Sequence, residues 1–270
     1  MSGAIIGRQF TLFWVAVQFL TRLPTPRLND FKTEWLSASA RYFPVVGALV
    51  GAINVCIWWT ASQWLPVPVA VGLMMGASLL VTGAFHEDGF ADVCDGFGGG
   101  STPESVLAIM KDSRVGAYGA IGVAMMLGLK WCTLVALPIS VFPAVVAAAH
   151  MFSRWCATAL IYRLRYVRGE KDSKSKPLAE SLSGANWLLS GALGTLALLP
   201  MALFLKPGDR TLTLSTVGAA ALASLLVMLM AAAYCRKRLG GYTGDCLGAV
   251  QQLTELTFLI TALGLLRARG

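Results

Sequence analysis

Residues 43–85, FPVVGALVGAINVCIWWTASQWLPVPVAVGLMMGASLLVTGAF, contain two long apolar runs and no Asp, Glu, Lys or Arg. Each run approaches the roughly 20 residues that an α-helix needs to cross the hydrocarbon core of a bilayer. Pro66 and Pro68 lie between the two runs, where they can end one helix and begin the next. This stretch therefore predicts a hairpin of two membrane-spanning helices.

The rest of the 270-residue chain repeats this pattern, because 56% of all residues are hydrophobic and only 13% are charged. In soluble domains about a quarter of the residues are charged. We therefore expect one all-α integral membrane domain over residues 1–270, with about seven transmembrane helices. These apolar windows lie at approximately residues 43–65, 66–85, 116–137, 139–162, 186–206, 212–234 and 246–266. The earlier apolar stretch at residues 10–20 is short for a span and predicts an amphipathic or partly inserted helix.

The formal net charge of +8 comes from basic residues that lie between the apolar windows instead of forming one stripe. This distribution argues against nucleic-acid binding and indicates a membrane topology. Most Lys and Arg residues fall in the N-terminal segment and in the connections near residues 86–115, 163–185 and 235–245. Since positive residues favour the cytoplasmic side, we expect these segments to face the cytoplasm.

Four acidic residues are concentrated in residues 86–96, HEDGFADVCDG, directly after the second window. If this segment is helical, Asp88, Asp92 and Asp95 share one face within about 60°, whereas Glu87 points about 100° away. Carboxylates on one face repel one another unless a cation lies between them. Hard oxygen ligands favour magnesium, manganese or calcium over zinc. The segment predicts a metal site, and a solvated acidic loop is the alternative.

A second polar group, at residues 111–116, precedes the third window. Arg114 suits bidentate phosphate contact and Lys111 adds a point charge, with Asp112 between them. For Lys111 alone, a positively charged membrane anchor is an equally good reading. Upstream, Ser101 or Thr102 is expected to cap a short helix that runs to about Asp112.

A third polar group, residues 239–248, is rich in glycine and leads into the last window. Its helix start can offer free amide hydrogens to an anion. From there Asp245, Gly248, Gln252 and Glu255 form one polar stripe. Such a stripe indicates a bundle interior or a wet cavity. Asp245 either joins the metal or phosphate site or only caps its helix, and Glu255 is either catalytic or a buried partner for another helix.

Four further charged or polar features are three residues within spans and one basic loop. Arg154 is expected to reach phosphate or to pair with one of the acids, and His150 to be a packed polar residue. Lys130 is expected to snorkel toward the membrane surface. The loop at residues 163–176 predicts a lipid-facing, topogenic segment, with nucleotide binding as the alternative.

Five separated motifs resemble the cobalamin synthase family, the adenosylcobinamide-GDP ribazoletransferases. They lie at residues 19–26, 41–47, 86–96, 111–116 and 240–249. The resemblance implies a magnesium-dependent enzyme of the bacterial inner membrane. It would transfer the adenosylcobinamide phosphate of adenosylcobinamide-GDP to alpha-ribazole or its 5'-phosphate and release GMP. In the family pattern the position of Glu87 is variable, so Glu87 is the weakest member of the acidic group.

Residues and resemblance together give a set of candidate site residues. The candidate catalytic residues are Asp88, Asp92, Asp95 and His86, and the candidate metal ligands are Asp88, Asp92, Asp95 and Glu87. The candidate substrate-binding residues are Lys111, Asp112, Arg114, Arg154, Thr243 and Asp245. A sugar hydroxyl would attack the diphosphate in line, and His86 or one of the carboxylates would accept its proton.

Two other functions share parts of this pattern. A CDP-alcohol phosphotransferase of lipid synthesis also carries an Asp-Gly-containing acidic motif at a span end, but it requires a lipid acceptor. A carboxylate-lined transporter would favour paired broken helices, and no matching acidic motif occurs in the second half of the chain. A homo-oligomer is compatible with the sequence.

Overall fold

The computed structural model describes residues 2–28, 32–167, 182–198 and 207–268. Every element in these residues is a helix, apart from one isolated β-bridge between Tyr166 and Tyr242, so the expected all-α class is confirmed. The helices are α1 (Ser2–Leu20), α2 (Thr33–Ser39), η1 (Ala40–Tyr42), α3 (Phe43–Ala61), α4 (Val67–Thr82), α5 (Phe85–Gly99), α6 (Pro103–Lys111), α7 (Ala117–Ala136), α8 (Phe142–Arg163), α9 (Gly184–Ala197), α11 (Pro207–Leu239) and α12 (Gly244–Arg267).

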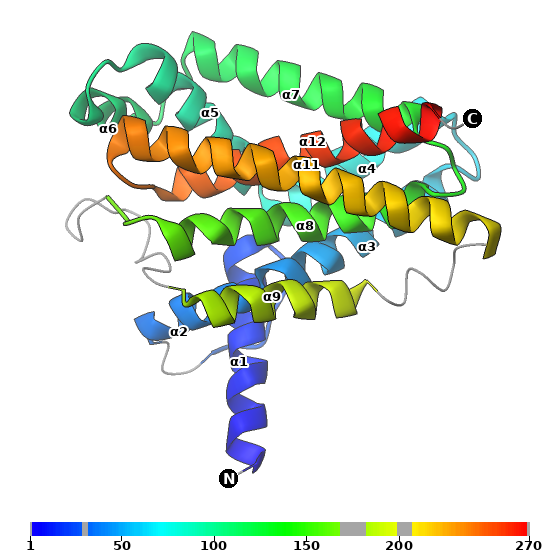
Figure 1. Cartoon of the computed structure of the whole chain (residues 1–270), viewed down its shortest axis with the longest axis horizontal. Coiled ribbons are helices and arrows are strands. Elements are labelled where there is room, and N and C mark those ends of the chain that lie inside the picture. Colours follow the sequence, from blue (N-terminus) through cyan, green and yellow to red (C-terminus); the bar gives the residue numbers. More distant parts are fainter. Residues whose placement is uncertain (1, 29–31, 168–181, 199–206, 269–270) are drawn as a thin grey trace.

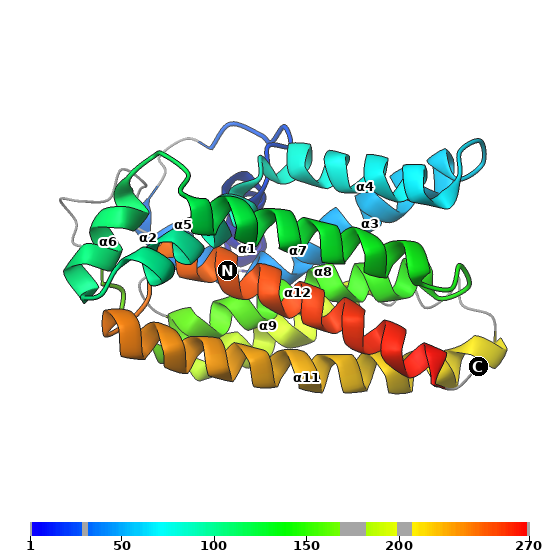
Figure 2. The ribbon, with the colours of Figure 1, turned by 90° about the horizontal axis from the view of Figure 1, so that it is seen from above.

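The long helices run alongside one another as an elongated bundle (Figures 1 and 2). Helix α8 lies at its centre and packs against α3, α9, α11 and α12. Most residues of α8 are buried within the protein, whereas α7 and α11 expose most of their apolar side chains. These exposed apolar faces are suited to contact lipid, as expected for the outer helices of a membrane bundle.

The chain is a multi-pass membrane protein, but the predicted count of seven spans is not reached in the described residues. Five helical segments are long and apolar enough to cross a membrane, or six if α4 and α5 together form one bent span. The window at residues 66–85 forms the shorter helix α4, which meets α5 at an angle of 87°. The window at residues 186–206 begins as α9, and part of it lies outside the described residues.

The bend between α4 and α5 is built from two residues with left-handed backbone, Gly83 (φ 65°) and Ala84 (φ 54°). Glycine ends a helix readily in this conformation, whereas alanine adopts it at a steric cost. A Cβ atom on Gly83 would lie 2.1 Å from Nε of Arg22, so no larger residue fits there. The backbone amide of Arg22 also donates to the carbonyl of Val81 at 2.7 Å. The N-terminal segment thus packs against the bend, and the bend sets the direction of α5.

Helix α1 differs from the others in direction, because it projects across the bundle (Figure 1). The predicted N-terminal helix is therefore present, and it is longer than residues 10–20. Its C-terminal half is anchored by Leu12 and Val15, which are buried, while Phe10 is exposed. Its insertion into the membrane surface stays a prediction.

Candidate active site

The acidic segment forms helix α5, and its first two aspartates lie one turn apart on it. Asp88 is exposed and Asp92 is half-buried. Between them, Gly89 lets α5 approach the start of α12 so closely that a Cβ there would lie 3.0 Å from Cα of Asp245. Gly248, one turn into α12, packs in the same way on the backbone of His86. These glycine contacts bring Asp245 beside the turn of α5 that carries Asp88 and Asp92.

Asp95 has a different environment from Asp88 and Asp92, because its carboxylate lies at the N-terminus of α7. Its two oxygens accept hydrogen bonds from the backbone amides of Gly116 (2.7 Å) and Gly119 (2.8 Å). A Cβ on either glycine would come within 2.5 Å of this carboxylate. Asp95 therefore satisfies amides that the start of a helix leaves unpaired, and it favours the dipole of α7.

His86 and Glu87 point into the protein interior. Oε1 of Glu87 accepts a hydrogen bond from Nε2 of Gln252 at 2.8 Å. His86 is buried and lines a small cavity together with Arg154 and residues of α12. The predicted catalytic and metal-binding segment is thus divided into a mouth, formed by Asp88 and Asp92, and a buried part.

The mouth is suited to a magnesium ion that is held partly by water and substrate, and not to one enclosed in a preformed cage of protein ligands. Within the described ranges, no three His, Cys, Asp or Glu side chains are arranged to hold a metal ion. Mg²⁺ in phosphate-transfer enzymes is typically held by one or two carboxylates, waters and substrate phosphates, and needs no all-protein cage. Asp88 and Asp92, one helical turn apart, would be the oxygen ligands of such a site. Asp95 and Glu87 already use carboxylate oxygens in contacts within the protein.

Asp112 and Arg114 form an ion pair on the surface of the connection between α6 and α7. Nη2 of Arg114 lies 2.6 Å from Oδ2 of Asp112, and the Arg114 side chain is 87% exposed. Hydrogen bonds from Arg114 lower the pKa of Asp112 to about 2. Before this connection, Thr102 caps α6 in a reciprocal pair with Ser105, as predicted for the helix start. The exposed guanidinium of Arg114 can meet a phosphate from solution.

The glycine-rich turn before α12 is fixed by contacts with the segment that follows α8. The backbone amide of Tyr242 donates to the carbonyl of Arg165 at 2.9 Å, and a Cβ on Gly241 would lie 2.1 Å from the same oxygen. Thr243 is buried and is the N-cap of α12, accepting from the amide of Cys246. Because Thr243 occupies the capping position, Asp245 in the first turn is not needed as the cap.

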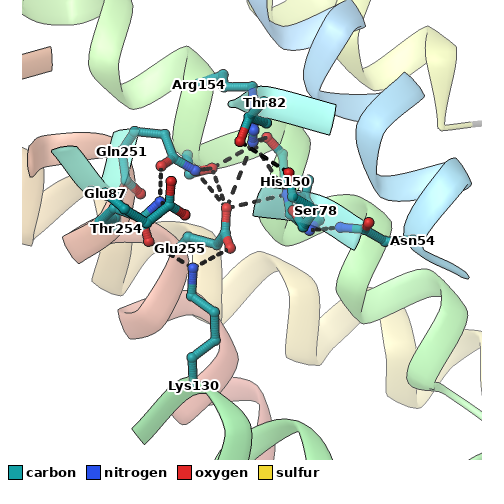
Figure 3. Close-up of polar contacts among 12 residues, drawn as sticks. Asn54, Ser78, Thr82, Glu87, Lys130, His150, Arg154, Gln251, Thr254 and Glu255 are labelled. Carbon is teal, nitrogen blue, oxygen red and sulfur yellow. Dashed lines mark hydrogen bonds and ion pairs between the residues drawn. The ribbon is translucent and has the colours of Figure 1, made fainter. Parts of the chain in front are cut away.

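A buried network of charges lies deeper in the bundle, around Glu255 (Figure 3). Its carboxylate lies 2.8 Å from Nζ of Lys130, 3.2 Å from Nδ1 of His150 and 3.6 Å from Nη1 of Arg154. The prediction that Lys130 snorkels is wrong, since its side chain is buried. Glu255 and Gln252 give the ammonium group partners in the interior, which replace the water it would otherwise seek.

Amide side chains close this network into a ring. Lys130 donates to Oε1 of Gln252 at 2.7 Å, and Nε2 of Gln252 donates to Oε1 of Gln251 at 2.8 Å. Nε2 of Gln251 then donates to Glu255 at 2.5 Å, while Asn54 joins through His150 at 2.8 Å. The sequence interpretation missed Gln251 and Asn54. The signal for Gln251 was its four-residue spacing from Glu255, and the signal for Asn54 was an amide in the middle of an apolar window.

Arg238 of α11 holds the far end of α5. Its guanidinium donates to the carbonyl oxygens of Phe97 (2.8 Å) and Gly100 (2.6 Å). It also lies 5.1 Å from the ring centroid of Phe97 and 5.7 Å from that of Tyr234. A cation at the C-terminus of a helix satisfies its free carbonyls and favours its dipole. This role could not be predicted from the sequence, because Arg238 lies in a run of basic residues that is typical of a topology signal.

Comparison with known proteins connects this architecture to one family. The profile of the family described as cobalamin-5-phosphate synthase matches residues 12–263. Among curated proteins, an adenosylcobinamide-GDP ribazoletransferase of Leptothrix cholodnii is 45% identical over 257 residues, covering 94% of this chain and 95% of the relative. A protein of the same name from Shewanella frigidimarina is 43% identical over 274 residues, covering 98% of this chain and 100% of the relative.

A third relative of that name, from Shewanella oneidensis, is 41% identical over 268 residues, covering 95% of this chain and 96% of the relative. No solved structure matches the chain. The family match includes all the helices that form the mouth and the buried network, from α3 to α12. This chain therefore belongs to the cobalamin-5-phosphate synthase family.

Proposed function

We propose that this protein transfers the adenosylcobinamide phosphate of adenosylcobinamide-GDP to alpha-ribazole or its 5'-phosphate, with release of GMP. One observation carries the proposal: glycine packing of α5 on α12 brings Asp88, Asp92 and Asp245 to one mouth. That mouth lies in a chain whose relatives are named for this reaction. A diphosphate substrate suits such a mouth when a divalent ion accompanies it.

The reaction forms one phosphorus–oxygen bond and breaks another. The hydroxyl oxygen of the ribazole sugar attacks the phosphorus next to the cobinamide, and the bond to GMP breaks. A bound magnesium ion would neutralise negative charge that gathers on the phosphoryl oxygens. Asp88 and Asp92 would hold this ion, while Arg114 would bind phosphate oxygens from the exposed connection. A carboxylate of the mouth is better placed than buried His86 to accept the hydroxyl proton.

The positions of the basic residues indicate how the protein is oriented in the membrane. The end of the bundle that carries the mouth also carries three basic residues in the last turn of α11, namely Arg236, Lys237 and Arg238. Basic residues favour the cytoplasmic side of a membrane. We therefore place the mouth on the cytoplasmic side of the bacterial inner membrane, where large, water-soluble nucleotide substrates are available.

The decisive experiment measures GMP release by the purified protein from adenosylcobinamide-GDP, with and without alpha-ribazole. Ribazole-dependent release that requires magnesium supports the proposal. Parallel assays offer diacylglycerol and inositol phosphate with CDP-linked donors. Transfer to these acceptors, with no release of GMP in the presence of ribazole, would instead assign a CDP-alcohol phosphotransferase.

A further inference from the structure

We propose that the polar interior behind α5 is a binding site for ordered water, held by the side-chain oxygens of Glu87 and Asn54. Among the described residues, Oε2 of Glu87 and Oδ1 of Asn54 are buried and have no hydrogen-bond partner. Both residues line the same cavity. Buried acceptors of this kind are costly unless a donor reaches them, so two of them facing one cavity indicate a ligand.

The cavity has room and polarity for water. Its volume is about 20 Å³, above the roughly 10–15 Å³ that one water molecule requires. Its polar lining residues come from six helices and are Asn54, Ser78, Glu87, Lys130, His150 and Glu255. Figure 3 shows these side chains converging around Glu255 between α3, α4, α7 and α8. A buried water typically makes about three hydrogen bonds, and this lining supplies them.

The charges of the lining favour a neutral ligand over a metal cation. The carboxylates of Glu87 and Glu255 are matched by the ammonium group of Lys130 and the guanidinium of Arg154, which both lie within 4 Å of Glu255. A further cation would lie near these two without a free counter-charge. The unpartnered atoms on residues that line the cavity, Oε2 of Glu87 and Oδ1 of Asn54, are acceptors, so the ligand must donate hydrogen bonds. Water is the small neutral donor that meets both conditions.

The orientation of Asn54 supports the same conclusion. Nδ1 of His150 lies 3.2 Å from the carboxylate of Glu255 and 3.2 Å from Nη1 of Arg154, and in the tautomer that is protonated at Nδ1 the atom Nε2 is an acceptor. The amide nitrogen of Asn54 donates to that Nε2 at 2.8 Å. Oδ1 of Asn54 is therefore the free atom that turns to the cavity.

X-ray radiolytic labelling tests this site in the full-length protein in nanodiscs, because bound water forms hydroxyl radicals where it lies. Met74 lines the cavity and is 2% exposed, whereas Met228 is equally buried and lies outside it. In ¹⁸O-labelled water we expect Met74 to be oxidised on the order of tenfold faster than Met228, because radicals act within contact distance of bound water. Equal rates would overturn the proposal. The result does not depend on the proposed transfer reaction.

Two variants of α4 sharpen the test. Ser78→Leu inserts an apolar side chain into the cavity, and we expect it to lower the labelling of Met74 to the rate of Met228. Gly76→Leu adds the same side chain where a Cβ meets nothing within 4 Å, and should leave the labelling unchanged. Fast labelling that persists in folded Ser78→Leu would contradict the site. A thermal midpoint that rises with sodium, but not with choline at equal ionic strength, would assign a cation instead of water.

Discussion

The mouth and the interior of this protein use the same kinds of charged side chain in opposite ways. Asp88 at the mouth and Arg114 on the connection between α6 and α7 are both exposed, and Arg114 has a carboxylate partner from its own loop. In the interior, the charges of Lys130, Arg154 and Glu255 are buried and paired between different helices. The mouth charges can exchange partners with a substrate, whereas the interior charges cannot do so without breaking the bundle.

This contrast distinguishes the side chains that serve the reaction from those that stabilise the fold. A buried ion pair whose partner is removed leaves an uncompensated charge, and its loss destabilises the fold. An exposed carboxylate adds little to stability, so its loss affects only what it binds. Substitutions at the mouth should therefore change transfer with the fold intact, and substitutions in the interior should change unfolding first.

The largest effect is expected at the mouth. Asp88→Asn or Asp92→Asn should lower transfer about a hundredfold or more, because each removes a ligand charge from the metal that neutralises the phosphoryl oxygens. The thermal unfolding midpoint should stay within error of wild type. GMP release at limiting magnesium measures the first quantity, and tryptophan fluorescence measures the second.

Glu104→Gln is the matched control for these variants, because Glu104 is an exposed acid in the first turn of α6. It should keep full transfer. Wild-type turnover in both aspartate variants at limiting magnesium would remove Asp88 and Asp92 from the metal site.

The interior gives the second largest effect, now on stability. Glu255→Gln should cost about 3–5 kcal/mol of unfolding free energy, since it leaves both Lys130 and Arg154 without their carboxylate. Lys130→Met should cost less, because Glu255 keeps Arg154 and His150. Denaturant titration in detergent orders the two variants, with Glu34→Gln on exposed α2 as the control. The reverse order would mean that Glu255 is not the centre of the network.

Hydrophobic windows and helical spacing were enough to predict the all-α membrane fold and the inward stripe at Gln252 and Glu255. These features depend on local sequence and on the lengths that a bilayer imposes. The bend after α4 could not be read in this way. It depends on a left-handed alanine at position 84, which no local preference favours, and on Arg22 packing from a distant segment.

Long-range partners explain the other differences. Lys130 was expected at the membrane surface because it lies toward one end of its window, but its partner Glu255 lies on another helix. Asp95 shares a helical face with Asp88 and Asp92, yet it reaches the start of α7 because Gly116 and Gly119 leave space for its carboxylate. Helical spacing predicts a face but not the element that packs against it.

A third effect tests how the two regions are joined, through the contact of Arg238 with the end of α5. Arg238→Lys keeps the charge but loses the paired bonds to the Phe97 and Gly100 carbonyls. We expect transfer to fall about tenfold, because a small displacement of α5 misplaces Asp92. The magnesium concentration for half-maximal rate should rise as well. Arg236→Lys, an exposed site nearby, is the control, and equal behaviour of the two variants would exclude the positioning role.

The smallest effect is expected at the exposed pair of Asp112 and Arg114. Arg114→Ala should raise KM for adenosylcobinamide-GDP a few-fold and leave the unfolding midpoint unchanged, because a solvent-screened contact contributes to binding more than to folding.

The pKa of Asp112 is lowered from 3.8 to about 2. Its stabilising contribution is therefore present above pH 3.8 and is lost as the pH falls through about 2. Between pH 5 and 8 the pair stays charged, so the KM difference between wild type and Arg114→Ala should not change with pH. Asp112→Asn frees the guanidinium and should lower KM or leave it unchanged. If Arg114→Ala had wild-type KM across this range, Arg114 would serve only as a basic residue at the membrane surface.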